Sequence, residues 1–333
     1  MEIYQTLNPI HSICDLKKKL KSLKSIGVTG IRINFNKFNL QMDMKKVLEV
    51  IEIMNRYRGW YQYQLDIPYP NSKARILNHN IKNSVIQKDK IYEIYFDKKY
   101  YKHLEDSILV SDVAKYTETE ILYFGDGQGT FKIVTCDNTK YRVKALSTFD
   151  IYKAKSISLG IKDNRENIEQ LLGAIENYCV ECDFIYVLSL VENVEDIMKF
   201  RKKINLSHSI MAKLETHESI RNYKEIISVV DSIMIARGDM AILNDYTKLL
   251  FYIEQIVEFA KKANKKVFVA TDILTSVRRG DYLPSRADIV DLSHMFRIGC
   301  EGVVLSRTDN LTSIERQVEV VREIYESIKI CIK

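Results

Sequence analysis

Short runs of β-branched and aromatic residues alternate along the chain with longer stretches in which apolar residues recur at helical spacing. The expected strands are Ile3–Leu7, Gly30–Asn34, Tyr61–Asp66, Phe184–Ser189, Ile210–Leu214, Ser232–Ala236, Val267–Ala270 and Gly302–Ser306. The expected helices are Asp15–Ile26, Met44–Tyr57, Asn167–Tyr178, Val194–Lys203, Tyr246–Ala263, Ser285–Ile298 and Ile314–Ile328. This alternation predicts an α/β fold in which eight parallel strands close into a (β/α)8 TIM barrel. An open dinucleotide-binding sheet is the weaker alternative, because no G-x-G-x-x-G follows the first strand.

One region breaks the alternation. Between residues 76 and 158 apolar residues recur at every second position, and turn residues such as Gly125, Asp126 and Gly127 punctuate the pattern. This predicts a small antiparallel β domain inserted between two barrel parts, residues 1–75 and 159–333. The glycine-rich segment at 125–129 lacks the Lys-Ser/Thr of a phosphate-binding P-loop, so a hairpin turn is favoured.

Composition excludes several classes of protein. The 333 residues carry 50 Lys and Arg against 44 Asp and Glu, a net charge of +6, with 46% hydrophobic residues. This balance is typical of a globular protein and lacks the clustered basic footprint of a nucleic-acid binder. No basic segment followed by an apolar stretch opens the chain, and no apolar run approaches about 18 residues, so we expect a cytoplasmic protein without a membrane span. Cys179 and Cys182 form a single CxxC, for which packed thiols are favoured over a zinc or redox site.

The expected strands end in polar residues. These are Asn8, Arg32, Asn34, Asn36, Asp66, Ser189, Lys213, Glu215, Arg237, Asp239 and Thr271. Barrel enzymes carry their chemistry at this end of the strands, and we therefore expect these side chains to converge there.

Charged groups on neighbouring strands suggest particular chemistry. Glu215 and Asp239 offer hard oxygen ligands suited to Mg²⁺ or Mn²⁺, although either carboxylate taken alone could cap a helix or pair with a surface lysine. Lys213 lies two residues before Glu215, so both would point to the same side of the strand. Its ammonium could neutralise charge on a transferring phosphoryl group or an enolate, and on spacing alone a solvated lysine is an equal alternative. Gly238 would let the backbone approach an anion beside Arg237.

Several segments resemble those of pyruvate kinases, in the same order along the chain. Lys213–Glu218 is similar to Lys-Ile-Glu-Asn-His-Glu, and Ile233–Asp239 to Ile-Met-Val-Ala-Arg-Gly-Asp. Further matches are Thr6–Pro9 to Thr-Ile-Gly-Pro, Arg32–Asn36 to Arg-Leu-Asn-Phe-Ser, Leu65-Asp66 to Leu-Asp-Thr, Gly125–Gly127 to Asp-Asp-Gly, Ala270–Ser276 to Ala-Thr-Gln-Met-Leu-Glu-Ser, and Pro284–Asp288 to Pro-Thr-Arg-Ala-Glu. The motifs span nearly the whole chain. They are highly specific for the pyruvate kinase superfamily and less specific for any one activity.

The resemblance implies a glycolytic phosphotransferase that uses phosphoenolpyruvate or a related acid together with ADP or ATP. It implies roles for catalytic Lys213, Thr271 and Arg32, and for substrate-binding Ser189, Gly238, Arg237 and Thr271. Glu215 and Asp239 would hold Mg²⁺ or Mn²⁺, and K⁺ would lie at Asn34, Asn36, Asp66 and the carbonyl of Ile67. The inserted domain, including Asp126, would act as a lid that excludes water. No nucleic-acid or membrane partner is expected, and formation of a homo-oligomer stays open.

The chain also departs from the family pattern. It stops near Ile328–Lys333, so the family's C-terminal effector-binding domain, and regulation of that type, are not expected. Residues 66–75 stand where the family has Asp-Thr-Lys-Gly-Pro-Glu-Ile-Arg, and they differ from that segment. Lys73 or Arg75 could bring a fixed positive charge near the K⁺ site. Further changes fall at Ala241–Leu243 and at Arg307-Thr308.

Three functions remain open on the sequence. The first is a compact pyruvate kinase. The second is a related barrel enzyme that applies the same metal and enolate chemistry to another phosphorylated or 2-oxo acid, and the third is a non-catalytic ligand-binding relative. Retention of the charged set that includes Arg32, Lys213, Glu215 and Asp239 disfavours the third, and the number of matching motifs favours the first.

Overall fold

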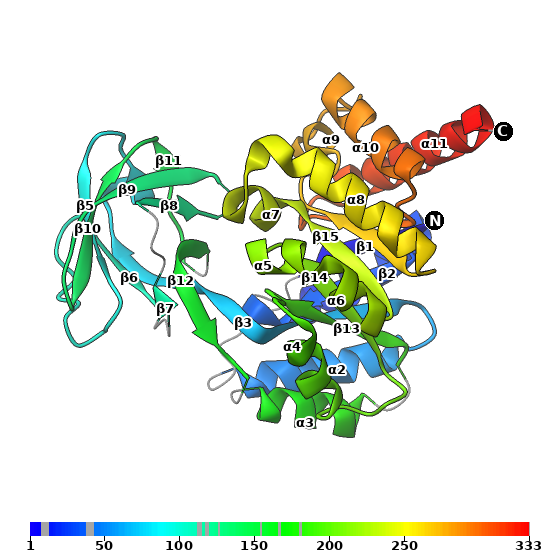
Figure 1. Ribbon diagram of the computed structural model, residues 1–333, viewed down its shortest axis with the longest axis horizontal. Coiled ribbons are helices and arrows are strands. Elements are labelled where there is room, and N and C mark those ends of the chain that lie inside the picture. The colour runs from blue at the N-terminus through cyan, green and yellow to red at the C-terminus, as the bar shows by residue number, and fades with distance from the viewer. Residues whose placement is uncertain are drawn as a thin grey trace. The chain divides into compact units, whose positions relative to one another are not determined.

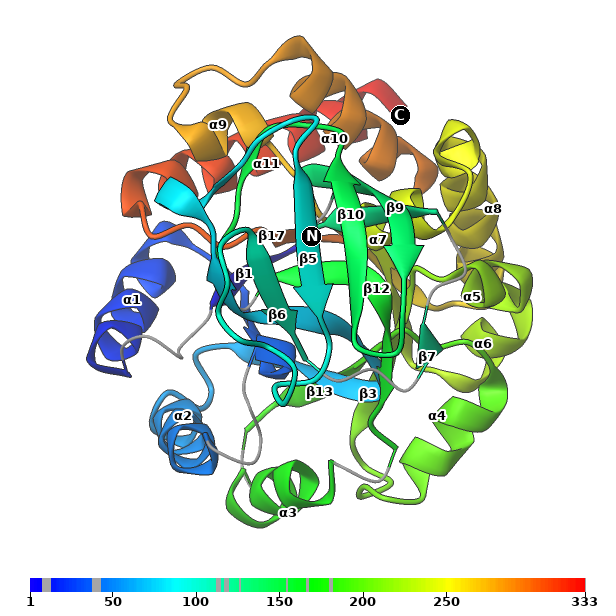
Figure 2. The same cartoon turned by 90° about the vertical axis from the view of Figure 1, so that its left-hand side faces the viewer.

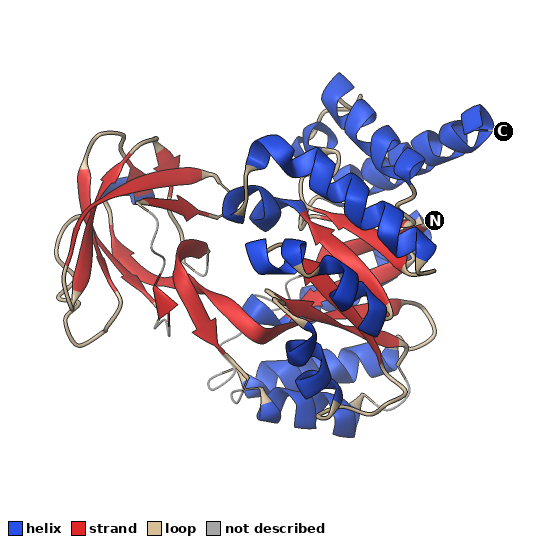
Figure 3. Ribbon diagram, in the orientation of Figure 1, coloured by secondary structure: helices blue, strands red, loops and turns tan. Residues whose placement is uncertain are grey.

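A computed structural model of the chain describes residues 1–7, 13–37, 43–111, 115–116, 120–125, 127–153, 155–165, 168–179 and 182–332. The chain divides into two compact units. Unit 1 comprises Met1–Pro70 and Asn167–Lys333, and unit 2 comprises Asn71–Glu166. Helices belong almost entirely to unit 1, and unit 2 is built of strands (Figure 3).

Unit 1 is the predicted TIM barrel. Its strands are β1 (Glu2–Leu7), β2 (Gly30–Asn34), β3 (Gln62–Asn80), β13 (Phe184–Ser189), β14 (Ser209–Leu214), β15 (Ser232–Ala236), β16 (Lys266–Ala270) and β17 (Gly302–Leu305). Each pairs in parallel with the next, and β17 pairs with β1, so the sheet closes. Several of these strands are labelled in Figure 1. The predicted fold class is therefore confirmed.

Helices surround the barrel strands as an outer ring (Figure 2). The described helices are α1 (Ile13–Ile26), α2 (Met44–Arg56), α3 (Glu169–Tyr178), α4 (Val194–Arg201), α5 (His217–Arg221), α6 (Tyr223–Val229), α7 (Arg237–Leu243), α8 (Leu249–Lys262), α9 (Thr275–Arg279), α10 (Arg286–Ile298) and α11 (Leu311–Ile332). Short 3₁₀ turns occur at η1 (Phe35–Lys37), η2 (Lys82–Ser84) and η3 (Tyr246–Lys248). The main apolar core lies between this ring and the strands, where the amphipathic helices bury one face.

A second apolar cluster fills the inside of the barrel. It comprises Tyr4, Ile185, Val187, Met211, Met234, Phe268, Ala270 and Val304. The rings of Tyr4 and Phe268 meet edge to face with centroids 5.5 Å apart. A Cβ atom at Gly30 would lie 2.1 Å from the Tyr4 ring, and one at Gly302 would lie 2.5 Å from the Phe268 ring. Glycine at these two strand positions therefore makes room for the aromatic pair.

Unit 2 is the inserted β region. The end of β3 joins β4 (Val85–Ile86), β5 (Ile91–Tyr95), β6 (Ser107–Val110), β7 (Lys115–Tyr116), β8 (Ile121–Phe124), β9 (Gly129–Cys136), β10 (Lys140–Ala145), β11 (Phe149–Asp150) and β12 (Ser156–Asp163). The order β3-β6-β5-β10-β9-β8-β12 closes because β12 also pairs with β3. Its described pairings are antiparallel, as predicted, except that β5 and β6 run parallel. A separate apolar cluster that includes Phe124, Phe131 and Val143 gives this unit its own core.

Candidate active site

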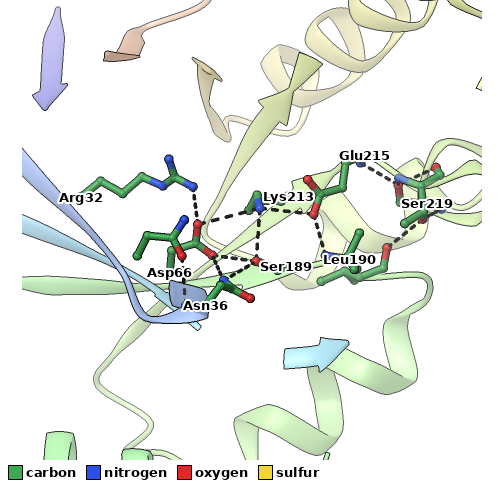
Figure 4. A network of polar contacts seen from close by, with 11 residues as sticks. Arg32, Asn36, Asp66, Ser189, Leu190, Lys213, Glu215 and Ser219 are labelled. Carbon is green, nitrogen blue, oxygen red and sulfur yellow. Dashed lines mark hydrogen bonds and ion pairs between the residues drawn. The ribbon is translucent and has the colours of Figure 1, made fainter. Parts of the chain in front are cut away.

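Polar side chains from consecutive barrel strands meet at the carboxyl ends of those strands. Asp66 comes from β3, Ser189 from β13 and Lys213 from β14, and these strands are neighbours in the closed sheet. Glu215 follows β14 directly, and Arg32 reaches the group from β2. Figure 4 shows these side chains converging from elements that lie far apart in the sequence.

Asp66 is the centre of this network and is completely buried. Its Oδ1 accepts hydrogen bonds from Ser189 Oγ at 2.7 Å and from Asn36 Nδ2 at 3.0 Å. Its Oδ2 forms an ion pair with Arg32 and lies 3.8 Å from Lys213 Nζ. Burial alone would raise the pKa of Asp66, but Lys213 and Arg32 outweigh burial and hold that pKa below its ordinary value. The carboxyl is therefore ionised at neutral pH.

Lys213 lies between two carboxylates. Its Nζ is 3.3 Å from Glu215 Oε1 and donates to Ser189 Oγ at 3.2 Å. Burial would lower the pKa of Lys213, but Asp66 and Glu215 outweigh burial and raise it above its ordinary value. The Lys213 side chain is 10% exposed, so its ammonium is buried and fixed rather than solvated, which was the alternative.

Glu215 is held in place from several sides. Its Oε1 accepts a hydrogen bond from the backbone N–H of Leu190 at 2.7 Å, and its own N–H donates to Ser219 Oγ at 3.0 Å. Thr216 and Ser219 form a reciprocal capping box at the start of α5. Leu190 has a φ of +54°, a left-handed backbone conformation that residues other than glycine adopt rarely. The carboxylate therefore has a defined position at the end of β14.

Asp239 lies in the first turn of α7, directly after β15. It contributes electrostatically to the raised pKa of Lys213, as Glu215 does more strongly. Glu215 and Asp239, the two predicted metal ligands, thus both lie near enough to Lys213 to raise its pKa. Two hard oxygen donors fit Mg²⁺, which proteins commonly hold through one or two carboxylates while water and phosphate oxygens complete its shell. Among the described residues, no three His, Cys, Asp or Glu side chains form a metal cluster by themselves.

Arg237 and Thr271 meet in a second polar group. Arg237 donates to the backbone carbonyl of Thr271 through Nη2 at 2.7 Å and through Nε at 3.2 Å, and its Nη1 is 2.5 Å from Asp291 Oδ1. Gly238 follows Arg237 in the first turn of α7. The guanidinium therefore braces the turn after β16, and the substrate-binding role that the resemblance implies for Arg237 stays a prediction.

That turn has a strained backbone. Thr271, Asp272 and Leu274 all have positive φ, at +76, +53 and +49. A β-branched residue with positive φ is a real outlier, and such strain persists only where the surroundings impose it. Besides Arg237, Gln317 donates to the carbonyl of Ile273 at 3.1 Å. Thr271 thus sits on a rigid turn at the rim of the barrel.

The remaining predicted site residues have varied surroundings. Asn34 Oδ1 accepts a hydrogen bond from the Asn36 backbone N–H at 3.0 Å, and Ile67 is buried in β3 opposite Leu188 of β13. Asn8 and Asp126 lie outside the described residues. The Cys179 and Cys182 thiols are buried and are not joined in a disulfide. A hydrogen bond with Cys182, together with burial, raises the pKa of the Cys179 thiol, as expected for packed thiols.

Sequence reasoning did not single out several groups that shape the site. Besides the Leu190 N–H, Asn244 donates to the carbonyls of Glu215 at 3.2 Å and Met240 at 2.9 Å, and so ties α7 to the end of β14. Asp291, which pairs with Arg237, belongs to none of the matched sequence motifs. Asp288 lay inside a matched segment, Pro284–Asp288, but no role was inferred for it.

The closed barrel makes this a TIM-barrel protein. Its ionisable groups gather at the carboxyl ends of the strands, where barrel enzymes carry their chemistry. None of the described helices is both long and apolar enough to cross a membrane. The sequence matches the model of the pyruvate kinase barrel domain over residues 1–310, and the chain therefore belongs to the pyruvate kinase family.

Individual relatives are distant. Pyruvate kinase 2 of Saccharomyces cerevisiae is 24% identical over 320 residues, which cover 91% of this chain and 61% of the yeast protein. Pyruvate kinase of Thermococcus litoralis is 25% identical, covering 87% and 62% of the two chains. Pyruvate kinase of Staphylococcus haemolyticus is 24% identical, covering 87% and 50%. The chain thus spans between half and about three fifths of the length of these curated relatives.

Proposed function

We propose that this protein is a pyruvate kinase-like phosphotransferase that converts phosphoenolpyruvate and ADP to pyruvate and ATP. The observation that carries the proposal is the buried Lys213 ammonium, fixed between Asp66 and Glu215 at the carboxyl ends of the barrel strands. A fixed cation in a site of low dielectric constant stabilises negative charge that develops during a reaction. Family membership supports this choice of substrates, because the relatives are named as pyruvate kinases.

The charges of the site suit an anionic substrate. Arg32 and Lys213 contribute two positive charges, and Asp66, Glu215 and Asp239 contribute three negative ones. A divalent cation at Glu215 and Asp239 would make the group net positive, which favours a phosphorylated acid. When bound, this cation would supply charge neutralisation at phosphoryl and carboxylate oxygens.

The chain's own residues would then act as follows. Arg32 would orient the transferring phosphoryl group, whose bond to the enol oxygen breaks as a bond to the terminal phosphate oxygen of ADP forms. Lys213 would stabilise the negative charge left on the enol oxygen. Thr271, on its rigid turn, would belong to the route that delivers a proton to the methylene carbon of the enolate and completes pyruvate.

Pyruvate formation from phosphoenolpyruvate with Mg²⁺ and a nucleoside diphosphate tests this function. Lys213→Met should lower kcat at least about 100-fold, as loss of a donor to a developing anion does, while Mg²⁺ affinity is largely kept. Lys202→Met removes an exposed lysine from the end of α4 and should leave kcat unchanged. Unaltered turnover in Lys213→Met would refute the role given to this residue.

The metal pair has its own test. Glu215→Gln and Asp239→Asn should each raise the Mg²⁺ concentration needed for half-maximal activity by about tenfold or more. Unchanged Mg²⁺ titrations in both variants would exclude this pair as the metal site. Absence of turnover with every nucleoside diphosphate would overturn the kinase proposal. Proton exchange into pyruvate without a nucleoside diphosphate would then distinguish an enolate-forming enzyme from a non-catalytic ligand-binding protein.

A further inference from the structure

The Asp66 carboxylate, to which the family resemblance assigns a K⁺ ion, is already surrounded by hydrogen-bond donors. Its Oδ1 accepts from Asn36 Nδ2 and Ser189 Oγ, and its Oδ2 faces Arg32 and Lys213. Asp66 is fully buried, so these donors, all from the protein, are its immediate surroundings. Each carboxylate oxygen thus has two protein partners (Figure 4).

The neighbouring oxygens are engaged as well. Ser189 Oγ donates its single proton to Asp66 and accepts from both Lys213 and Asn36, at 3.2 and 3.1 Å, which uses the full capacity of a hydroxyl. Asn34 Oδ1 accepts from the backbone N–H of Asn36. K⁺ is held by oxygen lone pairs, and at this position the Asn36 amide presents N–H groups to Asp66 and Ser189. The donors gathered around Asp66 therefore fit a monovalent cation poorly.

The orientation of the Asn36 amide follows from its surroundings. Turned the other way, its Oδ1 would lie against the ionised Asp66 Oδ1 with no proton between the two oxygens, because Ser189 already donates its one proton to Asp66. Two facing acceptors in a buried site are unfavourable. A K⁺ ion that relieved this contact would also meet the positive charges of Arg32 and Lys213, both directed at Asp66.

We propose that the side-chain amide of Asn36 takes the place of the monovalent cation in this protein, so that its reaction does not depend on K⁺. This inference rests on the proposed function for its kinetic consequence. The sequence supplies the reason: Asn36 stands where the matching family segment, Arg-Leu-Asn-Phe-Ser, has serine. A serine hydroxyl is shorter and has one proton, whereas the amide has two and here bridges Asp66 and Ser189.

The first experiment compares the wild-type chain in KCl, NaCl and tetramethylammonium chloride at equal ionic strength. We expect kcat for pyruvate formation to vary by less than about twofold among the salts. A fall of about tenfold or more without K⁺ would overturn the proposal.

A second measurement does not need activity. The midpoint of thermal unfolding in the same three salts reports cation binding, because a ligand that binds only the folded state raises that midpoint. We expect equal midpoints, and a rise specific to K⁺ would overturn the proposal. If no salt supports turnover, the proposed function fails, while the unfolding midpoints still decide whether a cation binds.

Substitution of Asn36 provides the converse test. Asn36→Ser should create a K⁺-specific rise in the unfolding midpoint and make activity depend on K⁺. Asn205→Ser, the same change in an exposed loop, should behave like wild type in every salt. Asn36→Asp keeps the size of the side chain and turns the donor into a second carboxylate, so it should also gain K⁺-specific stabilisation if Asn36→Ser does not fold. Absence of a K⁺-specific rise in the unfolding midpoint of every folded Asn36 variant would contradict the role given to the amide.

Discussion

Asp288 is a buried carboxylate in the first turn of α10 that organises the start of α9. Its Oδ1 accepts from the Thr275 backbone N–H at 2.9 Å, and its Oδ2 accepts from the Ser276 N–H at 3.0 Å and from the Ser276 hydroxyl. Burial would raise its pKa, but the hydrogen bonds from Ser276 outweigh burial and lower the pKa of Asp288. One residue thus anchors the helix that follows the strained turn at Thr271.

We predict that Asp288→Asn lowers the free energy of unfolding at pH 7 by about 1.5–3 kcal/mol, the usual range for hydrogen bonds to a charged group. The folded-state pKa lies below the ordinary value of 3.8, so this stability is fully present above pH 3.8 and is lost as the pH falls through the folded-state pKa. Urea unfolding of both proteins from pH 7 downward should show their difference shrinking only in this acidic range.

The exposed variant Asp281→Asn is the control, with an expected change within about 0.5 kcal/mol. A stability difference between wild type and Asp288→Asn that stays constant from neutral to acidic pH would show that the ionised carboxylate is not responsible.

At the scale of elements, strands β1, β2, β16 and β17 share one aromatic layer inside the barrel. Tyr4 and Phe268 fill it, and Gly30 and Gly302 leave space for their rings. Because barrel interiors are packed like protein cores, a methyl group added at such a glycine has no free volume to occupy.

Gly30→Ala should therefore destabilise the barrel by about 1–3 kcal/mol through overpacking. Combining it with Tyr4→Leu, which removes the ring that the new methyl group would meet, should cost less than the sum of the two single changes. Chemical unfolding of the four proteins measures this coupling.

Gly173→Ala is the matched control, because nothing lies within 4 Å of its added Cβ in the middle of α3. This change should raise the unfolding free energy by up to about 1 kcal/mol, the difference in helix propensity. Strictly additive effects of the Gly30 and Tyr4 changes would contradict the proposed packing.

The sequence predicted the repeating elements better than the irregular ones. The expected strand at Tyr61–Asp66 in fact continues to Asn80 as β3, and the signal stopped early because Pro68 and Pro70 are uncommon inside strands. Helices α5, α6, α7 and α9 were not predicted, since five to seven residues show no clear helical period. The expected helix from Tyr246 to Ala263 begins with the 3₁₀ turn η3 before α8.

Asn244 links the end of strand β14 to helix α7. It bonds to the carbonyls of Glu215 at the end of β14 and Met240 in α7, the helix that carries Asp239. On the proposed function, Asn244→Ala should lower Mg²⁺ affinity about 10- to 100-fold, as the loss of groups supporting metal ligands does. A Mg²⁺ titration of activity and of the thermal unfolding midpoint measures this effect.

Asn205→Ala, in an exposed loop, is the control and should leave both titrations unchanged. A Mg²⁺ affinity in Asn244→Ala equal to that of wild type would show that Asn244 does not position the two carboxylates.

At the scale of the whole molecule, two units with separate cores share one chain. Unit 2 is an insertion in the barrel sequence, and each unit buries its own apolar cluster. Near the junction, Asn71 of β3 is the antiparallel register partner of Asp163 of β12. The chain therefore enters and leaves the insertion at neighbouring points.

Replacing residues 72–162 with a short glycine-rich linker should leave a barrel that folds cooperatively, because antiparallel partners lie only about 4.5–5.5 Å apart. Circular dichroism should show a helix-rich protein with a single thermal transition. A product that aggregates or unfolds without cooperativity would show that the barrel depends on the insertion.

The convergence of the site was predictable because parallel strands in a closed barrel all end at the same face. Arg32, Asp66, Ser189, Lys213 and Glu215 meet there as expected. The finer contacts were not predictable, because they depend on backbone conformations with no sequence signal. The left-handed Leu190 that directs an N–H at Glu215, and the η1 turn that carries the Asn36 amide to Asp66, are of this kind.

Closure of the barrel strands, and of the strands of unit 2 around β3 and β12, has a consequence for the behaviour of the protein at high concentration. An unpaired strand edge is a template for pairing with another chain. Among the described strands, only β4, β7 and β11 have a single neighbour, and each of them is two residues long. An edge this short offers little backbone for intermolecular β-pairing, so the folded protein should resist edge-to-edge aggregation although its chain is rich in β-forming residues.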